Sequence, residues 1–115
     1  MDDARIDELK AMVIRFCEER DWDRYHNLKD LSIGISTEAG ELLDLFRFKD
    51  DEECLALLGT EKGRTDISDE LADVLFFVLR FSHVAGIDLR DALVSKIVKN
   101  AEKYPVEKAK GSNLK

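Results

Sequence analysis

The stretch ISDELADVLFFVLRF, residues 67–81, decides the fold of this 115-residue chain. Its apolar side chains recur at the spacing of one helix face, at Ile67, Val74, Phe77 and Phe81. Glu70 fills the gap in this stripe. An ionised carboxylate that faces a core must be neutralised, paired or bound to a metal, because burying a bare charge is costly. The stretch therefore predicts a long helix that carries acidic chemistry on its buried face.

The acidic spacing of this helix occurs twice, in Glu38-Ala39-Gly40-Glu41 and in Glu70-Leu71-Ala72-Asp73. In each pair the carboxylates stand three residues apart and project from one face of a helix. Glu38 also interrupts an apolar stripe, formed by Leu31, Ile35, Leu42 and Leu45. We expect the two pairs to converge, and the alternative is that they form buried ion pairs. The small residues inside the first pair would let a helix or a substrate approach closely, or would simply serve ordinary helix packing.

The types of ligand indicate which metal such a cluster would bind. Carboxylate oxygens suit a hard cation, Mg²⁺ or Mn²⁺, whereas zinc sites favour His or Cys. A di-iron carboxylate bundle would use Glu-x-x-His, and neither His26 nor His83 has a glutamate three residues before it. A magnesium ion held in this way usually serves a phosphate substrate. We therefore expect Mg²⁺ as the cofactor, with Mn²⁺ able to substitute.

The periodicity of the whole chain predicts an all-α fold, a four-helix bundle. The expected helices are 3–20, a second capped by Asn27 and ending near Phe48, a third from Asp66 or Ser68 to 85, and a fourth from Asp88 to 104. Within the connection 49–65, residues 53–58 are expected to form a short helix. Pro105 ends the last helix, so the predicted domain is 1–105, followed by a polar tail, 106–115.

Composition narrows the class of protein. The net charge of −7 argues against a general nucleic-acid binder, which needs cations to neutralise phosphates. The longest uninterrupted apolar run, residues 74–79, is too short to span a membrane, and the first residues lack the apolar stretch of a signal peptide. Cys17 and Cys54 form no C-x-x-C motif, which is typical of reduced thiols. We expect a cytoplasmic protein without a nucleic-acid or membrane partner.

The last helix supplies positive charge that could bind phosphate. Lys96, Asn100 and Lys103 share one face, and Lys99 lies beside them. Ammonium groups near a metal cluster could hold phosphate oxygens that the metal leaves uncoordinated. The alternative is a solvated basic face near a helix C-terminus, where the helix dipole favours cations in any case.

Aromatic residues near the second helix could hold a nucleobase by stacking. Trp22 and Tyr25 stand in the connection before this helix, and Phe48 stands at its expected end. The alternative is that these rings close the ends of the bundle. His26, in the same connection, could contact a substrate or be incidental.

A neighbouring subunit is expected against the helix that contains residues 74–79. This run, VLFFVL, is apolar all round the helix, so more than one face needs cover. A second copy of a small four-helix unit would supply it, and the alternative is a central helix buried within one chain.

The acidic motifs resemble those of the MazG-like nucleoside triphosphate pyrophosphohydrolases. The resemblance rests on E-x-x-E, a spacer of 28 residues (42–69) and E-x-x-D. Further segments are similar to the dCTP pyrophosphatase-like branch of this family: ERDWDRYH at 19–26, LFRFK at 45–49, KIVKNAEKYP at 96–105 and KGSN at 110–113. Two positions differ from that branch, because Phe48 stands where a second tryptophan is usual and Val13 where some members carry a histidine.

The resemblance implies an all-α protein that assembles as a homodimer or homotetramer and hydrolyses a nucleoside triphosphate to the monophosphate and pyrophosphate with Mg²⁺. The implied substrate is dCTP or a modified pyrimidine nucleotide, in the house-cleaning of nucleotide pools. The implied metal ligands and catalytic residues are Glu38, Glu41, Glu70 and Asp73, one of which would help to activate water. The implied substrate-binding residues are Trp22 and Phe48 for the base and Asn100, Lys103 and Tyr104 for phosphates or sugar. The competing interpretation is a non-catalytic helical interaction module with structural or silent metal-binding carboxylates.

Overall fold

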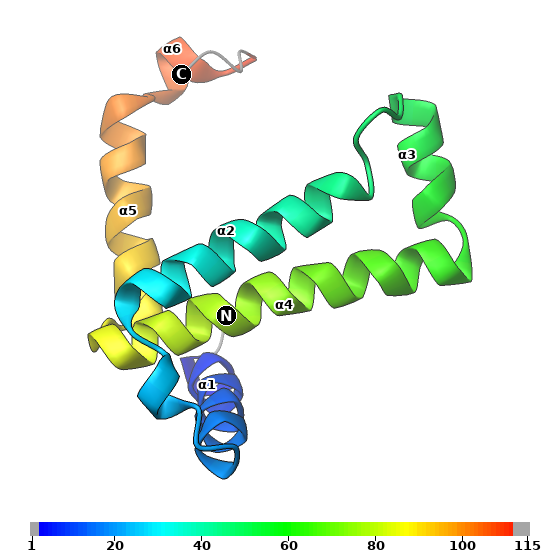
Figure 1. Cartoon of the computed structure of the whole chain (residues 1–115). Coiled ribbons are helices and arrows are strands. Elements are labelled where there is room, and N and C mark those ends of the chain that lie inside the picture. The colour runs from blue at the N-terminus through cyan, green and yellow to red at the C-terminus, as the bar shows by residue number, and fades with distance from the viewer. Residues whose placement is uncertain (1–2, 112–115) are drawn as a thin grey trace.

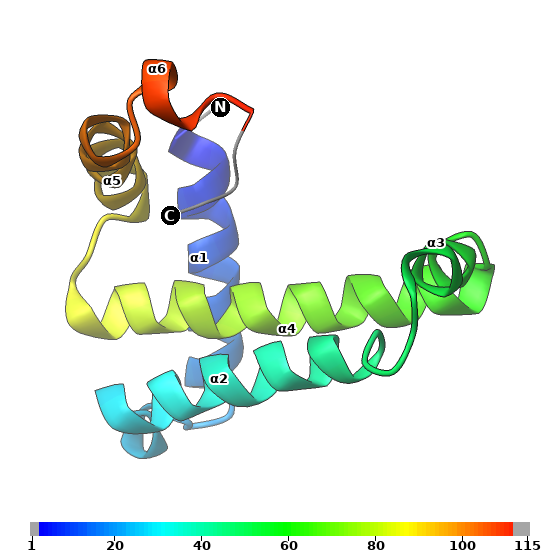
Figure 2. The same cartoon turned by 90° about the horizontal axis from the view of Figure 1, so that it is seen from above.

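The described residues, 3–111 of a computed structural model, form helices and turns with no strand. Two long helices make the body of the molecule: α2 (Leu28–Asp44) and α4 (Glu61–Ala85) lie side by side and run in opposite directions (Figure 1). Helix α1 (Asp3–Glu19) crosses α4, and α3 (Asp51–Leu58) packs against the start of α4 (Figure 2). The predicted all-α fold is confirmed. No helix in this part of the chain is long and apolar enough to cross a membrane.

Local capping signals place several helix ends where the sequence predicts them. The Asn27 side chain accepts a hydrogen bond from the backbone N–H of Asp30 and so caps α2. The Asp88 side chain accepts from the N–H of Asp91 in the same way. Gly86 closes α4 with φ of 68°, a left-handed conformation that a residue without Cβ adopts at little cost.

The predicted start of the long helix at Asp66 or Ser68 is wrong. Helix α4 begins directly after Thr60, whose hydroxyl accepts a hydrogen bond from the N–H of Gly63. Gly63 is buried, and a Cβ at this position would lie 2.0 Å from the carbonyl oxygen of Leu57 in α3. The glycine weakens the helical pattern of the sequence, but it is what lets α3 pack closely on α4.

One further boundary differs from the prediction, one predicted short helix is confirmed, and one short helix was not predicted. Helix α2 ends at Asp44 rather than near Phe48, because residues 45–48 turn and Phe48 adopts a positive φ of 67°. The predicted short helix forms as α3, where Asp50 and Glu53 make a reciprocal capping box. A short helix, α6 (Val106–Ala109), also forms in the predicted polar tail. Ser112 and Asn113 of the KGSN segment lie outside the described residues.

The contact between α2 and α4 forms the centre of the molecule. The buried apolar side chains are Cys17, Leu31, Ile67 and Leu79. A Cβ on Gly34 would lie 2.6 Å from the Phe77 ring, so this glycine permits the close approach of the two helices. Gly40 has no such role within one chain, since a Cβ there would meet nothing within 4 Å. Both cysteines are free, as predicted.

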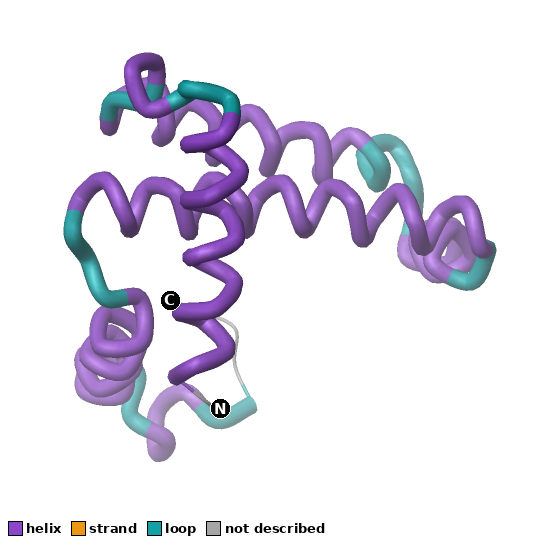
Figure 3. The backbone as a smooth tube through the Cα atoms, turned by 90° about the horizontal axis from the view of Figure 1, so that it is seen from below, coloured by secondary structure: helices purple, strands orange, loops and turns teal. Residues whose placement is uncertain are grey.

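Helix α5 (Leu89–Lys103) stands away from the pair formed by α2 and α4 (Figure 1 and Figure 3). Every residue from 90 to 103 is exposed. Four apolar side chains of this helix keep between 49% and 59% of their surface accessible: Leu93, Val94, Ile97 and Val98. One protomer therefore leaves an apolar helix face without cover.

Candidate metal centre and adjoining pocket

The two acidic pairs meet between α2 and α4. Glu38 and Glu41 extend from α2, and Glu70 and Asp73 extend from α4. Each residue offers one carboxylate oxygen, and these oxygens all lie within 4.8 Å of one another. Because the two helices run in opposite directions, the i,i+3 spacing in each is enough to bring all four carboxylates to one place, as the sequence predicts.

Two carboxyl groups of the cluster, those of Glu38 and Glu70, have raised pKa values. A hydrogen bond to Glu41, burial, and the charges of Glu41, Asp73 and Glu70 together raise the pKa of Glu38 to about 7. Burial, followed by a hydrogen bond to Glu41 and the neighbouring acidic charges, raises the pKa of Glu70. Without a cation, Glu38 therefore holds a proton to higher pH than an ordinary glutamate does.

The donor set fits a hard divalent cation. The Oε2 atoms of Glu38 and Glu70 are buried and have no hydrogen-bond partner. Buried carboxylate oxygens are normally satisfied, so two unsatisfied oxygens in one cluster indicate a missing ligand. Carboxylate oxygens are the ligands that Mg²⁺ and Mn²⁺ prefer.

Ion pairing does not account for the cluster. In the part of the chain that the structure describes, no lysine or arginine pairs with any of the four carboxylates. The acidic partners of the ion pairs are other residues: Glu19, Asp21, Asp23, Asp44, Asp66 and Asp91. The alternative that the acidic pairs are structural salt bridges therefore finds no support within one chain.

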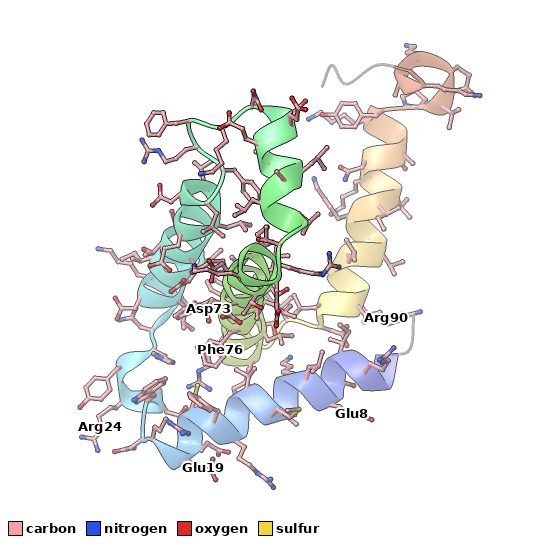
Figure 4. All side chains as sticks on the ribbon, turned by 90° about the vertical axis from the view of Figure 1, so that its right-hand side faces the viewer. Glu8, Glu19, Arg24, Asp73, Phe76 and Arg90 are labelled. Carbon is pink, nitrogen blue, oxygen red and sulfur yellow. The ribbon has the colours of Figure 1, made fainter. Side chains whose placement is uncertain are left out.

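An apolar pocket of about 470 Å³ adjoins the cluster. Its lining comes from α1, the α1–α2 connection and α4, and comprises Met12, Val13, Phe16, Trp22, Phe76 and Phe77 together with Asp73. Phe16 packs edge-on against both Trp22 and Phe76, with ring centroids 5.6 and 5.8 Å apart. Figure 4 shows Phe76 and Asp73 on α4, with Phe76 toward α1. Asp73 thus belongs both to the pocket and to the carboxylate cluster.

A buried arginine beside the pocket escaped the sequence analysis. Arg80 on α4 is 2% exposed, and its Nε donates a hydrogen bond of 3.2 Å to Nδ1 of His26. Its Nη2 pairs with Asp23 in the short 3-10 helix η1 (Asp23–Tyr25). The partners lie 54 and 57 residues away in sequence, so no local pattern reveals them. The only local signal is a charged residue within the apolar run of α4.

The remaining predicted substrate-binding residues do not join the cluster within one chain. Phe48 is 92% exposed and follows the C-terminus of α2, whereas Trp22 precedes its N-terminus. A 17-residue helix, about 25 Å long, lies between the two residues, and Phe48 is not among the residues that line the Trp22 pocket. The predicted phosphate ligands stand on or next to α5, where Lys96, Asn100 and Lys103 are exposed and Tyr104 is half-buried.

Sequence and structure comparisons relate this chain to known proteins. The family model described as the MazG-like family matches residues 33–115. The chain is 32% identical to mouse dCTP pyrophosphatase 1 and 30% identical to the human protein of that name, over 110 residues in each case. These matches cover 96% of this chain but 65% of the relatives, so the chain spans less than two thirds of their length. A crystal structure of a pyrophosphatase from Archaeoglobus fulgidus superimposes with a TM-score of 0.80 at 35% identity, covering 88% of this chain and 93% of that one. The chain belongs to the MazG-like family.

Proposed function

We propose that this chain is a nucleotide pyrophosphohydrolase, which converts a nucleoside triphosphate and water to the monophosphate and pyrophosphate. The observation that carries the proposal is that Asp73 is shared by the carboxylate cluster and the aromatic pocket. A site that binds cations for phosphates thereby adjoins a surface on which a base can stack. The names of the mammalian relatives and of the archaeal structure support the same reaction class.

We assign Mg²⁺ as the cofactor, with Mn²⁺ able to replace it. Glu38 and Glu70 would hold the cation with the buried oxygens that lack partners, and Glu41 and Asp73 would complete the ligand set. When bound, the cation supplies positive charge for phosphate oxygens and acidifies coordinated water. The cluster is what allows a chain of net charge −7 to accept a polyanion.

The chain's own residues would then bind and orient the nucleotide. Water attacks the α-phosphorus, the bond from that phosphorus to the bridging oxygen breaks, and pyrophosphate leaves with the electron pair. One carboxylate of the cluster accepts a proton from the attacking water. Trp22 and Phe16 would support the base. Following the relatives' name, we take dCTP or a modified pyrimidine nucleotide as the substrate.

We further propose that the working unit is a homodimer or homotetramer. The uncovered apolar face of α5 needs a partner surface, and a second copy is the simplest one. Two copies would also bring Phe48 of one chain to the Trp22 pocket of the other, a contact that one chain does not make. In that assembly Lys96, Asn100, Lys103 and Tyr104 would bind phosphates or sugar, as the family resemblance implies.

We place this activity in the cytoplasm and expect free nucleotides, rather than nucleic acid or membranes, as the partners. The acidic net charge opposes binding to a polyanionic duplex, whereas a single nucleotide needs only local neutralisation by the cation. The free cysteines are consistent with a reducing compartment.

The test is release of pyrophosphate from the canonical ribo- and deoxyribonucleoside triphosphates and from 5-substituted dCTPs, with and without Mg²⁺. We expect Mg²⁺-dependent release with the monophosphate as co-product and with pyrimidine substrates preferred. Glu61→Gln is the matched control for substitutions in the carboxylate cluster, because Glu61 lies in the first turn of α4, outside the cluster. Release of orthophosphate instead would contradict the reaction. No turnover in a protein that binds Mg²⁺ would favour the silent metal-binding module.

A further inference from the structure

Arg80 makes contacts that bear on the pocket without lining it. Its guanidinium lies inside the protein, and among the described residues its hydrogen bonds go to the connection between α1 and α2, through Asp23 and His26. The Nη1 atom is buried and has no partner among the described residues. An ion pair whose carboxylate, Asp23, is 56% exposed, and whose arginine keeps a buried donor unfilled, adds little net stability. Its clear effect is on position, because it fixes the connection to α4.

The connection that Arg80 holds carries one wall of the pocket. Trp22 and His26 flank η1, and their ring centroids are 5.9 Å apart. Trp22 in turn packs on Phe16, which packs on Phe76 of α4. The arginine on α4 and the ring contacts therefore fix this wall at two separate points.

The hydrogen bond from Arg80 also fixes the chemistry of His26. An arginine only donates, so Nδ1 of His26 must accept and cannot carry a proton. The neutral imidazole then carries its proton on Nε2. Burial, followed by the charge of Arg80, lowers the pKa of His26 against the opposing effects of Asp23 and Asp30, so the neutral ring is favoured at neutral pH.

We propose that Arg80 is a positioning residue, which holds the Trp22 wall of the pocket on α4 and keeps His26 as the Nε2–H tautomer. The inference rests on the proposed function for the identity of the ligand. The tautomer and the attachment of the connection do not depend on it.

The first experiment needs no activity. The chain has two histidines, so ¹⁵N spectra of the imidazoles resolve both, and a His83→Asn variant assigns the exposed one. We expect His26 to be protonated on Nε2 alone at neutral pH, and to become a mixture of tautomers in Arg80→Lys, because a lysine cannot reproduce the forked contact. An Nδ1–H ring in the wild type, or an unchanged His26 signal in folded Arg80→Lys, would overturn the proposal.

The second experiment separates position from folding. Arg80→Lys keeps the charge but weakens the attachment of the Trp22 wall to α4. We expect this variant to fold, with a KM raised about fivefold, as for one lost hydrogen bond, and a kcat within about twofold of the wild type. An unchanged KM in folded Arg80→Lys would overturn the proposal.

Arg24→Lys is the matched control, because Arg24 pairs with Asp21 in the same connection but is exposed. It should leave KM unchanged, whereas Arg80→Lys should raise it. If wild type hydrolyses no nucleotide, the proposed function fails separately, and the same comparison is made with dCTP affinity read from the fluorescence of Trp22, the one tryptophan of the chain. Equal affinities in wild type and folded Arg80→Lys would then overturn the positioning role.

Discussion

Gly34 on α2 faces the ring of Phe77 on α4, and a Cβ on this glycine would lie 2.6 Å from two ring carbons. Glu38 follows Gly34 by one helical turn, and Asp73 precedes Phe77 by one turn. Because the helices run in opposite directions, this contact lies directly beside the layer in which the carboxylates meet. The absence of a side chain at Gly34 thus sets the separation between the two halves of the cluster.

Gly34→Ala should push α2 and α4 apart. We expect a loss of about 1–3 kcal/mol in the free energy of unfolding, as for other overpacked contacts, together with weaker stabilisation by Mg²⁺. Gly40→Ala is the control, since a Cβ there meets nothing within 4 Å and alanine favours the helix by about 0.5–1 kcal/mol. Thermal unfolding of both variants, with and without Mg²⁺, checks this. Equal effects of the two substitutions would contradict the close contact.

Mg²⁺ should raise the melting temperature of the wild-type chain. A cation at about 100 times its Kd adds about 2.7 kcal/mol to the stability of the form that binds it. Glu38→Gln should lose most of this gain. When both proteins are free of metal, however, the variant should melt at a higher temperature than wild type, because a neutral amide removes one repelling charge. Scanning calorimetry across a Mg²⁺ series provides the measurement, with Glu61→Gln as the control. An undiminished Mg²⁺ response in Glu38→Gln would remove this residue from the ligand set.

The metal-free chain should lose stability as pH rises through neutrality. The pKa of Glu38 is about 7 in the folded chain against an ordinary 4.5, so the folded state binds this proton more tightly than the unfolded state. The resulting stabilisation is fully present below the unfolded pKa and is lost as pH rises through about 7. Melting temperatures from about pH 5 to about pH 8 should therefore fall more in wild type than in Glu38→Gln. His26, with its lowered pKa, acts in the opposite direction but is common to both proteins. Parallel curves would rule out the raised pKa.

Glu41→Gln should abolish turnover and keep the fold. Glu41 is exposed at the edge of the cluster, so the substitution removes a charge without disturbing packing. We expect kcat to fall at least about 100-fold, the scale of a lost acid–base or metal-binding group. Pyrophosphate release and circular dichroism measure the two properties. Near-wild-type turnover would refute the metal assignment.

Phe48→Ala should raise KM more than it lowers kcat. The ring is 92% exposed in one protomer, so its removal costs little packing within the chain. In the proposed assembly it stacks on the base held by another copy, and stacking contributes about 1–3 kcal/mol per base. Steady-state kinetics over several substrates test this. Phe48→Trp, which keeps an aromatic ring, should have a KM close to that of the wild type. A KM that does not change for any substrate would exclude Phe48 from the pocket.

Local signals in the sequence predict most of the helices and the meeting of the carboxylates. Asn27 and Asp88 cap helices where the pattern places them, and the spacing of Glu38 and Glu41 suffices once α2 lies against α4. The start of α4 is missed because Gly63 serves the packing of α3, which is a tertiary reason that overrides helix propensity. Arg80 is missed because its partners are distant in sequence.

The position of α5 shows a different limit of sequence reasoning. The pattern predicts its bounds and its basic face, but not that the helix stands clear of α2 and α4 in one chain. The apolar side chains of α5 stay exposed among the described residues. The contacts that would bury them are therefore not encoded in a local pattern of this sequence.

Asp73 belongs both to the carboxylate cluster and to the aromatic pocket. A ligand bound at either place would therefore contact the same side chain. A cation that draws this carboxylate toward the cluster alters the wall that a base would meet, and a seated base alters the carboxylate that the cation would meet. Thermodynamics makes this influence mutual: by whatever factor one ligand changes the affinity for the other, the second changes the affinity for the first. If the proposed function holds, binding of the nucleotide and binding of the cation are therefore a single coupled event rather than two independent ones.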